Sequence, residues 1–323
     1  MEFLVSGEIR ADKAVSNALQ IGRAEAARII KNGYVFCGEK TLEKVSQILR
    51  ENDLLIVKIP EEKKDENQRK NSPVNFDIEI LYEDDEILVL NKPAGLVIHE
   101  APSHKEITLC DWLKAKNFSL SNISGEFRQG IVHRLDKETT GAICVAKTDF
   151  AHRSLAKQLE TREMGRYYLA IIDRELKDDL IVEKPIARHP KDRIKMSASH
   201  GGKPAKSAFI KLANLSAKEE LIAAKLFSGR THQIRAHLSA INAHILGDIL
   251  YGYKPKKDET ELQIFLHAHR LYLKLPQNHK ILIVTAPIPP HFQSKIIAAI
   301  GAEKLAEITS ESFIANRFAA LLV

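Results

Sequence analysis

Short apolar runs rich in β-branched residues recur along the chain from residue 76 onward, and such runs are typical of β-strands. Strands are predicted at residues 76–82, 86–90, 142–146, 167–172, 208–212, 221–227, 271–275 and 281–285. Helical periodicity, with apolar residues three and four positions apart, is found at 150–160 and 231–242. Because few helices separate many strands, the pattern predicts an α+β fold with a mixed, mainly antiparallel sheet rather than a doubly wound parallel one.

Residues 61–75 interrupt this pattern, since Val74 is their only hydrophobic residue and opposite charges crowd together before Pro73. This composition predicts a linker. Residues 1–60 precede it and form a small α/β module, with helical patterns at 12–19 and 24–30 and extended patterns at 35–40 and 54–59. The linker is therefore expected to separate this module from the rest of the chain.

The main domain is expected at residues 76–291. This range begins with the first predicted strand of the sheet and ends where an apolar helical pattern begins. Residues 292–323 have an apolar helical pattern, which predicts a helical extension packed on the sheet. With 323 residues and 44% hydrophobic content, the chain can bury one full core and carry a small extra domain.

The charge and the cysteines narrow the class of protein. A formal net charge of +6 fits a partner with a phosphate backbone, although an ordinary soluble surface would also give it. Cys37, Cys110 and Cys144 are far apart and odd in number, so we expect neither a disulfide framework nor a zinc motif, and a reducing cytoplasm as the setting. No run approaches the roughly 20 apolar residues that span a bilayer.

The segment with the most chemical content is residues 130–141 (GIVHRLDKETTG), where Asp136 is predicted to lie in a loop beside apolar strands. A loop aspartate taken alone most often caps a turn. Here His133 and Arg134 lie beside it, and loops on a rigid sheet are where catalytic groups concentrate. Asp136 is therefore a candidate catalytic residue.

This segment resembles the catalytic loop of the RluA-type pseudouridine synthases, which convert uridine to pseudouridine in RNA without a cofactor or metal. Further segments match that family in the same order: 90–99 (LNKPAGLVIH), 145–148 (VAKT), 165–170 (GRYYLA), 202–205 (GKPA), 228–238 (SGRTHQIRAHL), 245–252 (ILGDILYG) and 266–268 (LHA). The match spans about residues 76–290, and chance agreement of so many ordered motifs is very improbable. One departure is mild, because Thr140 stands where the family often has serine and keeps the hydroxyl.

The resemblance implies roles for particular residues. Asp136 corresponds to the catalytic nucleophile, and Arg235 to the cation that keeps it ionised. Tyr168 corresponds to the tyrosine whose ring lies on the target uracil, and strand alternation places Tyr167 on the opposite face. The target nucleotide must be flipped into a pocket, and Arg134 is implied to help fill the space that it leaves.

Phosphate contacts are predicted in two places. The candidates in the main domain are Arg230, Lys92, Lys147, Arg166 and Lys203, although each equally fits a solvated surface charge. In the module, residues 10–13 (RADK), 22–35 (GRAEAARIIKNGYV) and 51–53 (END) resemble a small RNA-binding domain first described in a ribosomal small-subunit protein. That resemblance implies RNA contacts by basic residues on two helices, here Arg10, Lys13, Arg23, Arg28 and Lys31.

The module departs from its family at one position, because Gly22 precedes Arg23 where serine is typical. A solvated amphipathic helix pair is the alternative interpretation.

Histidine pairs could in principle bind a metal. His232 and His237 are five residues apart, however, which does not place them on one helix face, and no carboxylate or cysteine cluster accompanies His267 and His269. We therefore expect no metal.

The sequence thus predicts a cytoplasmic, monomeric RNA pseudouridine synthase acting on large-subunit ribosomal RNA, most like the branch that includes the D-type enzymes. Transfer RNA is the alternative substrate. Two other classes stay open: a non-catalytic RNA-binding ribosome-assembly factor, and a hydrolase of the sugar–base bond. For the isomerase, attack on the ribose carbon, elimination at the sugar and addition to the uracil ring all suit the same residues.

Overall fold

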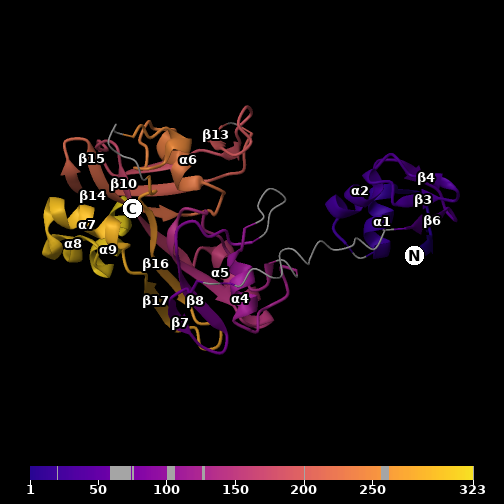
Figure 1. Ribbon diagram of the computed structural model, residues 1–323, viewed down its shortest axis with the longest axis horizontal. Helices are drawn as coiled ribbons and strands as arrows, with labels where there is room; N and C mark the ends of the chain where they lie inside the picture. The colour runs from indigo at the N-terminus through magenta and orange to yellow at the C-terminus, as the bar shows by residue number, and fades with distance from the viewer. Residues whose placement is uncertain are drawn as a thin grey trace. The chain divides into compact units, whose positions relative to one another are not determined.

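The structure is a computed structural model that describes residues 1–19, 21–58, 74, 76–99, 106–125, 128–199, 201–255 and 262–322. The chain divides into two compact units, a smaller unit of Met1–Pro73 and a larger unit of Val74–Val323 (Figure 1). The predicted linker at 61–75 lies outside the described residues except for Val74. Each unit is described by itself.

The smaller unit packs two helices against a short antiparallel sheet. Its elements are β1 (Glu2–Leu4), β2 (Ile9–Arg10), α1 (Ala11–Leu19), α2 (Arg23–Lys31), β3 (Val35–Cys37), β4 (Lys40–Thr41), β5 (Ile48–Leu49) and β6 (Leu54–Val57). The sheet has the order β1-β6-β3-β4, and β2 pairs with β5. Val15, Ile30, Val35 and Leu55 are buried between helices and sheet, which gives the unit a core of its own.

The larger unit is built on one long sheet, in which nine strands are found within the described residues. They are β7 (Ile80–Glu83), β8 (Ile87–Lys92), β9 (Thr140–Ala146), β10 (Gly165–Ile172), β11 (Leu180–Glu183), β14 (Lys206–Ser216), β15 (Glu219–Leu226), β16 (Leu266–Lys274) and β17 (Ile281–Thr285). The order is β11-β14-β15-β10-β16-β9-β8-β7, with β17 also paired to β16. Only the β16–β9 pair is parallel among these, so the predicted mixed, mainly antiparallel α+β fold is confirmed.

Helices cover both faces of the sheet. Successive side chains of each strand point to opposite faces, so one strand contributes to the core on both sides. The helices are α4 (Leu109–Ala115), α5 (Asp149–Thr161), α6 (Gln233–Ser239), α7 (Pro290–Ile300), α8 (Ala302–Ile308) and α9 (Glu311–Leu322), with a 3₁₀ turn η2 at Ile249–Tyr251. Along β10, Tyr168 and Ala170 belong to the core beneath α4 and α6. Tyr167 and Leu169 belong to the core beneath α7–α9, which gather at one edge of the unit in Figure 1. The alternation predicted for the two tyrosines is confirmed.

Two local features modify the sheet near the segments that carry the motifs. The ladder between β10 and β16 shifts register between Tyr167 and Leu169, so a bulge surrounds Tyr168. A separate hairpin, β12 (Ile186–Arg188) with β13 (Met196–Ala198), contacts α6. This hairpin and β11 were not among the predicted strands. Within the described chain, every helix is too short or too polar to cross a membrane.

Candidate active site

A pocket of about 620 Å³ opens in the larger unit where the loop before β9 meets β10 and the start of α6. The loop contributes Arg134 and Asp136, β10 contributes Tyr168, and the α6 region contributes His232 and Arg235. Three segments far apart in the sequence therefore meet here. The pocket gathers the three residues that the sequence predicts to be catalytic: Asp136, Tyr168 and Arg235.

The loop that carries Asp136 is fixed at both ends. Leu135 is buried in the core beneath α6, and the backbone N–H of Thr139 donates to the carbonyl of Asp136 at 3.1 Å. Gly141 then enters β9 with φ of +109°, and a Cβ there would lie 2.3 Å from the carbonyl oxygen of Ala268. Glycine is required here because two backbones approach closely. The loop thus holds Asp136 at a defined place on the sheet.

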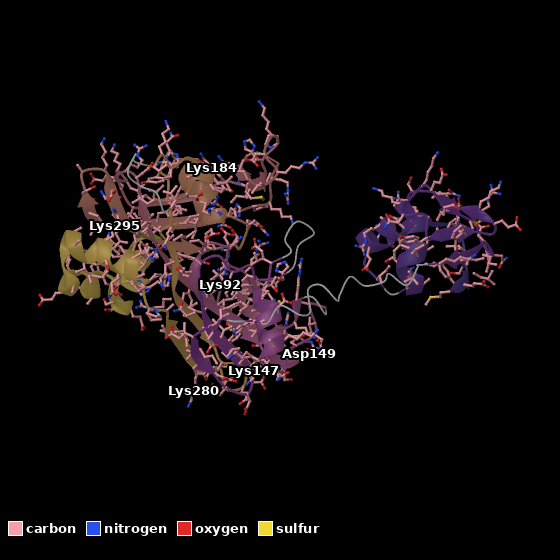
Figure 2. The ribbon with its side chains drawn as sticks, viewed as in Figure 1. Lys92, Lys147, Asp149, Lys184, Lys280 and Lys295 are labelled. Carbon is pink, nitrogen blue, oxygen red and sulfur yellow. The ribbon has the colours of Figure 1, made fainter. Side chains whose placement is uncertain are left out.

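Lys92 contacts this loop and lies inside the larger unit (Figure 2). Its side chain is fully buried, and its Nζ donates to the carbonyls of Pro93 at 2.7 Å, Leu96 at 3.0 Å and Lys137 at 2.8 Å. Burial lowers the pKa of Lys92 to about 7, while the charges of Glu138 and Asp136 oppose the shift.

The phosphate contact predicted for Lys92 is not supported by this geometry. All three donors of an ammonium group are committed to backbone carbonyls, and the group has no exposure to solvent. Lys92 instead ties residue 137, next to Asp136, to the turn that follows β8.

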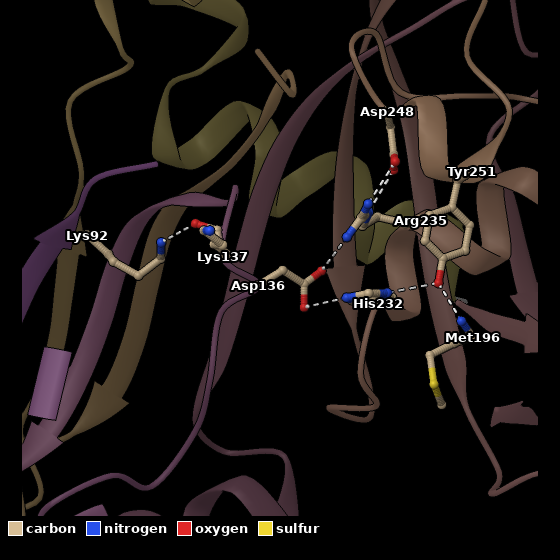
Figure 3. A network of polar contacts seen from close by, with 8 residues as sticks. All are labelled: Lys92, Asp136, Lys137, Met196, His232, Arg235, Asp248 and Tyr251. Atoms are coloured by element: carbon tan, nitrogen blue, oxygen red, sulfur yellow. Dashed lines mark hydrogen bonds and ion pairs between the residues drawn. The ribbon is translucent and has the colours of Figure 1, made fainter. Parts of the chain in front are cut away.

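Arg235 lies between two carboxylates (Figure 3). Its Nε and Nη2 each donate to Asp248 at 2.7 Å, and its Nη1 is 3.6 Å from Oδ2 of Asp136. Burial alone would lower the pKa of Arg235, but the hydrogen bonds and charge of Asp248, with Asp136, raise it on balance. Asp248 thus holds the guanidinium in a bidentate pair and leaves its third nitrogen for Asp136.

His232 approaches the other oxygen of Asp136. Its Nε2 is 3.9 Å from Oδ1, and its Nδ1 is 3.0 Å from the hydroxyl of Tyr251 (Figure 3). Burial lowers the pKa of His232, with the charge of Asp136 opposing. The guanidinium carbon of Arg235 lies 4.7 Å from the centre of the Tyr251 ring, so the same tyrosine also packs against the arginine.

Tyr168 lines the pocket from the sheet and is only 4% exposed. Burial raises the pKa of its hydroxyl, Arg166 opposes this, and the charge of Asp136 adds to it. The phenol therefore stays protonated at neutral pH. A buried ring whose one open side faces a pocket is suited to stacking on a planar base.

Cations dominate the rest of the pocket. Among the described residues that line it, Asp136 is the only carboxylate, against seven basic side chains: Arg128, Arg134, Arg162, Arg166, Lys225, Arg230 and Arg235. Arg134 and Arg230 are exposed, and Arg230 donates from Nε to the carbonyl of Pro204 at 3.1 Å. Such a surface attracts a polyanion.

Arg166 differs from the exposed cations because it is 7% exposed and its Nε has no hydrogen-bond partner within the described structure. Its Nη1 lies 3.2 Å from Nδ1 of His133. His133 Nε2 accepts the backbone N–H of Cys144 at 2.9 Å, so the proton of the neutral ring sits on Nδ1 and faces another donor. Burial lowers the pKa of His133 well below its usual value, which keeps the ring neutral. Arg166 therefore lines the pocket with one donor, its buried Nε, that has no partner in the described structure.

The five basic residues predicted in the smaller unit are not equivalent. Arg10 and Arg23 both bind Asp12, at 3.1 and 2.7 Å, and these bonds lower the pKa of Asp12 to about 2. Arg28 is exposed and lies 4.0 Å from Glu25, and Lys13 and Lys31 are exposed. Asp12 offsets part of the charge of the first two residues, so Lys13, Arg28 and Lys31 present the more open positive charge.

The sequence assigned no role to His232, Tyr251 or Asp248, although all three lie in segments that carried the resemblance. The structure shows that Asp248 and Tyr251, at the turn η2, face Arg235. His267 and His269 are buried and both contact the carbonyl of Ala286, at 3.3 and 3.2 Å. In the described chain, no group of three or more His, Cys, Asp or Glu is placed to hold a metal ion.

Comparison with known proteins agrees with this geometry. The sequence model of the RNA pseudouridylate synthase family matches residues 86–240. An uncharacterized RNA pseudouridine synthase of Helicobacter pylori is 40% identical over 317 residues, covering 96% of both chains. The ribosomal large subunit pseudouridine synthase D of Nitrosomonas europaea is 38% identical over 230 residues, covering 69% of this chain and 66% of that protein.

A solved structure has a similar fold. Human RNA pseudouridylate synthase domain containing 1 covers 68% of this chain and 87% of its own, with a TM-score of 0.54 and 22% identity. That structure supports the fold, and the relative that matches 96% of the sequence supports the family. The chain therefore belongs to the RNA pseudouridine synthase family and is a pseudouridine synthase.

Proposed function

We propose that this enzyme isomerises specific uridines of large-subunit ribosomal RNA, with Asp136 as the nucleophile and the target uridine flipped into the pocket. One observation carries the proposal: among the described lining residues, a single carboxylate lies in a cation-lined pocket beside Arg235, in a lining that also includes the buried ring of Tyr168. The carboxylate supplies the reacting group, and the cations match the charge of RNA.

Asp136 is suited to act as an anion. Its side chain is 14% exposed, enough to meet a substrate, and Nη1 of Arg235 lies 3.6 Å from one of its oxygens. In the reaction the bond from the ribose to N1 breaks, uracil turns, the ribose bonds to C5, and the C5 proton is lost while N1 gains one. Attack on the ribose, elimination at the sugar and addition to the ring all begin with an ionised Asp136.

Base flipping is supported by the size and depth of the pocket. A volume of about 620 Å³ lies in the range of small-molecule sites and has room for one nucleotide with its flanking phosphate. A uridine paired in folded RNA hides its sugar–base bond, so it must leave its stack to reach Asp136. Arg134 stands exposed two residues before Asp136, where its side chain can occupy the place of the flipped base.

Phosphate binding is assigned to the exposed Arg134 and Arg230 and to the buried Arg166. Arg166 supports this role most strongly, because a buried guanidinium with a free donor is satisfied when a phosphate oxygen arrives. In the smaller unit, Lys13, Arg28 and Lys31 are the residues that we propose to contact RNA outside the pocket.

Ribosomal RNA is favoured over transfer RNA because relatives named ribosomal large subunit pseudouridine synthase D match about 70% of this chain at 36–38% identity. The amino-terminal module supports the same choice through its resemblance to a ribosomal-protein domain. The substrate places the enzyme in the cytoplasm, and we propose that it acts as a monomer.

The decisive experiment uses RNA with tritium at carbon 5 of uridine, incubated with the wild type and with Asp136→Asn. Tritium release from large-subunit RNA by the wild type alone would support both reaction and substrate. Release only from transfer RNA would overturn the substrate. Tight binding without release would favour an assembly factor, and free uracil in the supernatant would identify a hydrolase.

A further inference from the structure

A line of polar contacts runs from the hairpin β12–β13 to Asp136. The backbone N–H of Met196, in β13, donates to the hydroxyl of Tyr251 at 2.8 Å. That hydroxyl lies 3.0 Å from Nδ1 of His232, and Nε2 of His232 lies 3.9 Å from Oδ1 of Asp136. Figure 3 shows the four groups in sequence.

The two ends of this line favour one direction for its protons. A backbone N–H can only donate, so the Tyr251 oxygen accepts at one end. At the other end, 3.9 Å away, the negative charge of an ionised carboxylate favours a ring N–H facing it over a ring lone pair. Both conditions are met when Tyr251 donates its own proton to Nδ1 and the neutral imidazole carries its proton on Nε2.

We infer that Tyr251 and His232 are a positioning pair, in which the tyrosine hydroxyl sets the tautomer of His232 so that Nε2–H faces the carboxylate of Asp136. The inference rests on the proposed role of Asp136 as the nucleophile. At 3.9 Å the N–H is too far for a hydrogen bond, but its dipole favours the anionic carboxylate. The lowered pKa of His232, caused by burial, keeps the ring neutral at pH 7.

The backbone of His232 adopts a conformation that few non-glycine residues have. Its φ is +53°, a left-handed conformation that is strained for a non-glycine residue and is found where the surroundings impose it. The conformation occurs at the residue that precedes α6, so the ring turns toward Tyr251 rather than along the helix. His232 and Tyr251 meet edge to face, with ring centres 5.6 Å apart.

Tyr251 also acts on the second group beside Asp136. The guanidinium of Arg235 packs on its ring at 4.7 Å, and the ammonium of Lys195, from the hairpin, lies 5.1 Å from the ring centre. One buried tyrosine thus orients both neighbours of Asp136, His232 through its hydroxyl and Arg235 through its ring. Tyr251→Phe removes the first contact and preserves the second.

The tautomer can be measured without any substrate. Nitrogen-15 labelling of histidine followed by NMR distinguishes the two ring nitrogens, and His232→Gln identifies the His232 signals among the 13 histidines. At about pH 7.5, above the lowered pKa of the ring, we expect the wild type to carry its proton on Nε2, and Tyr251→Phe to show a mixture of both tautomers. A proton on Nδ1, or on both nitrogens, in the wild type would overturn the inference.

Catalysis gives the second measurement. Tyr251→Phe should slow single-turnover tritium release on the order of tenfold, the scale of losing an outer hydrogen-bond partner, with RNA affinity unchanged. His232→Gln combined with Tyr251→Phe should be no slower than His232→Gln alone, because both changes break one line of contacts. An unchanged rate in Tyr251→Phe, or additive losses, would contradict the inference.

Tyr82→Phe is the matched control. It removes a tyrosine hydroxyl that donates to Asp84 at 2.9 Å, on β7 and outside the pocket lining, and should leave the rate unchanged. If the wild type isomerises no RNA but shows the Nε2 tautomer, the proposed function fails while the positioning pair stands. If the wild type is active and the tautomer is wrong, the pair alone fails.

Discussion

Replacing Asp248 by asparagine should strongly destabilise the larger unit, because Arg235 would lose the charge that compensates its own. The Asp248 side chain is fully buried, and that of Arg235 is 7% exposed. The two groups share two hydrogen bonds of 2.7 Å. Asparagine has nearly the same shape, so the change leaves no cavity, but it removes the charge and replaces one accepting oxygen by an NH2 group that faces an N–H donor of Arg235.

The expected loss follows from this burial. Removing one partner of a buried ion pair costs about 3–5 kcal/mol, since the remaining charge cannot recover its hydration. Asparagine retains one accepting oxygen and Asp136 remains 3.6 Å from Nη1, so we place the loss near the lower end, at about 3 kcal/mol. For a unit of this size, that loss lowers the Tm by about 6–12 °C.

Urea unfolding and calorimetry measure the effect, with Asp179→Asn as the matched control. Asp179 also binds an arginine, Arg317 at 2.6 Å, but the two side chains are 23% and 40% exposed, so its loss should cost only about 0–1 kcal/mol. Adding Arg235→Met to Asp248→Asn should restore part of the stability, because the orphaned charge is gone. Equal losses for Asp248→Asn and Asp179→Asn would refute the argument from burial.

Three further changes test other parts of the larger unit. Lys92→Met should alter how stability depends on pH, because between pH 7 and about 10.5 the unfolded wild type binds one more proton than the native state. The free energy of unfolding of the wild type should therefore rise relative to that of the variant by up to about 1.4 kcal/mol per pH unit. The same pH dependence of urea unfolding in both proteins would contradict this. Gly141→Ala should cost more than about 3 kcal/mol, because its Cβ would lie 2.3 Å from a carbonyl oxygen, whereas Gly301→Ala, with φ of +79° and open space, should cost only the backbone strain of about 1–3 kcal/mol. Phe318→Ala should cost about 3–5 kcal/mol in calorimetry, since the ring is fully buried against Tyr167, and a loss below about 1 kcal/mol would show that α9 is not part of the core.

Much of the sheet could be predicted because strands that are buried on both faces have dense apolar, β-branched sequences. The runs that became β10 and β15 agree with the structure to within about two residues, and so does that of β17, which is mostly exposed but equally rich in β-branched residues. The strands β11 and β12–β13 were not predicted, since each has only three or four residues and only partial burial. A short half-exposed strand leaves little periodicity to detect.

The sequence predicts which residues line the pocket, but not which residues hold them in position. The ordered motifs alone point to Asp136, Tyr168 and Arg235, and all three line one pocket. The support of Arg235 by Asp248 depends on a turn whose residues lie 13 positions further on. The burial of Lys92 was missed for a related reason, because a lysine in a turn is usually solvated and only tertiary packing places three carbonyls around its ammonium.

The parallel ladder between β9 and β16 joins two halves of the sheet through only two residue pairs, His267 with Thr140 and Ala268 with Gly141. Asp136 precedes β9 on one half, whereas Tyr168 lies in β10 on the other half, and the partners of Asp136 come from α6, which packs on that second half. Asp136 and its partners therefore belong to two halves of the sheet that share a narrow seam. The hydrogen bond of 2.8 Å between Thr140 and His267 spans it. Since a misplacement of about 1 Å can cost on the order of a hundredfold in rate, this seam would set the working distances of the proposed active site although none of its residues lines the pocket.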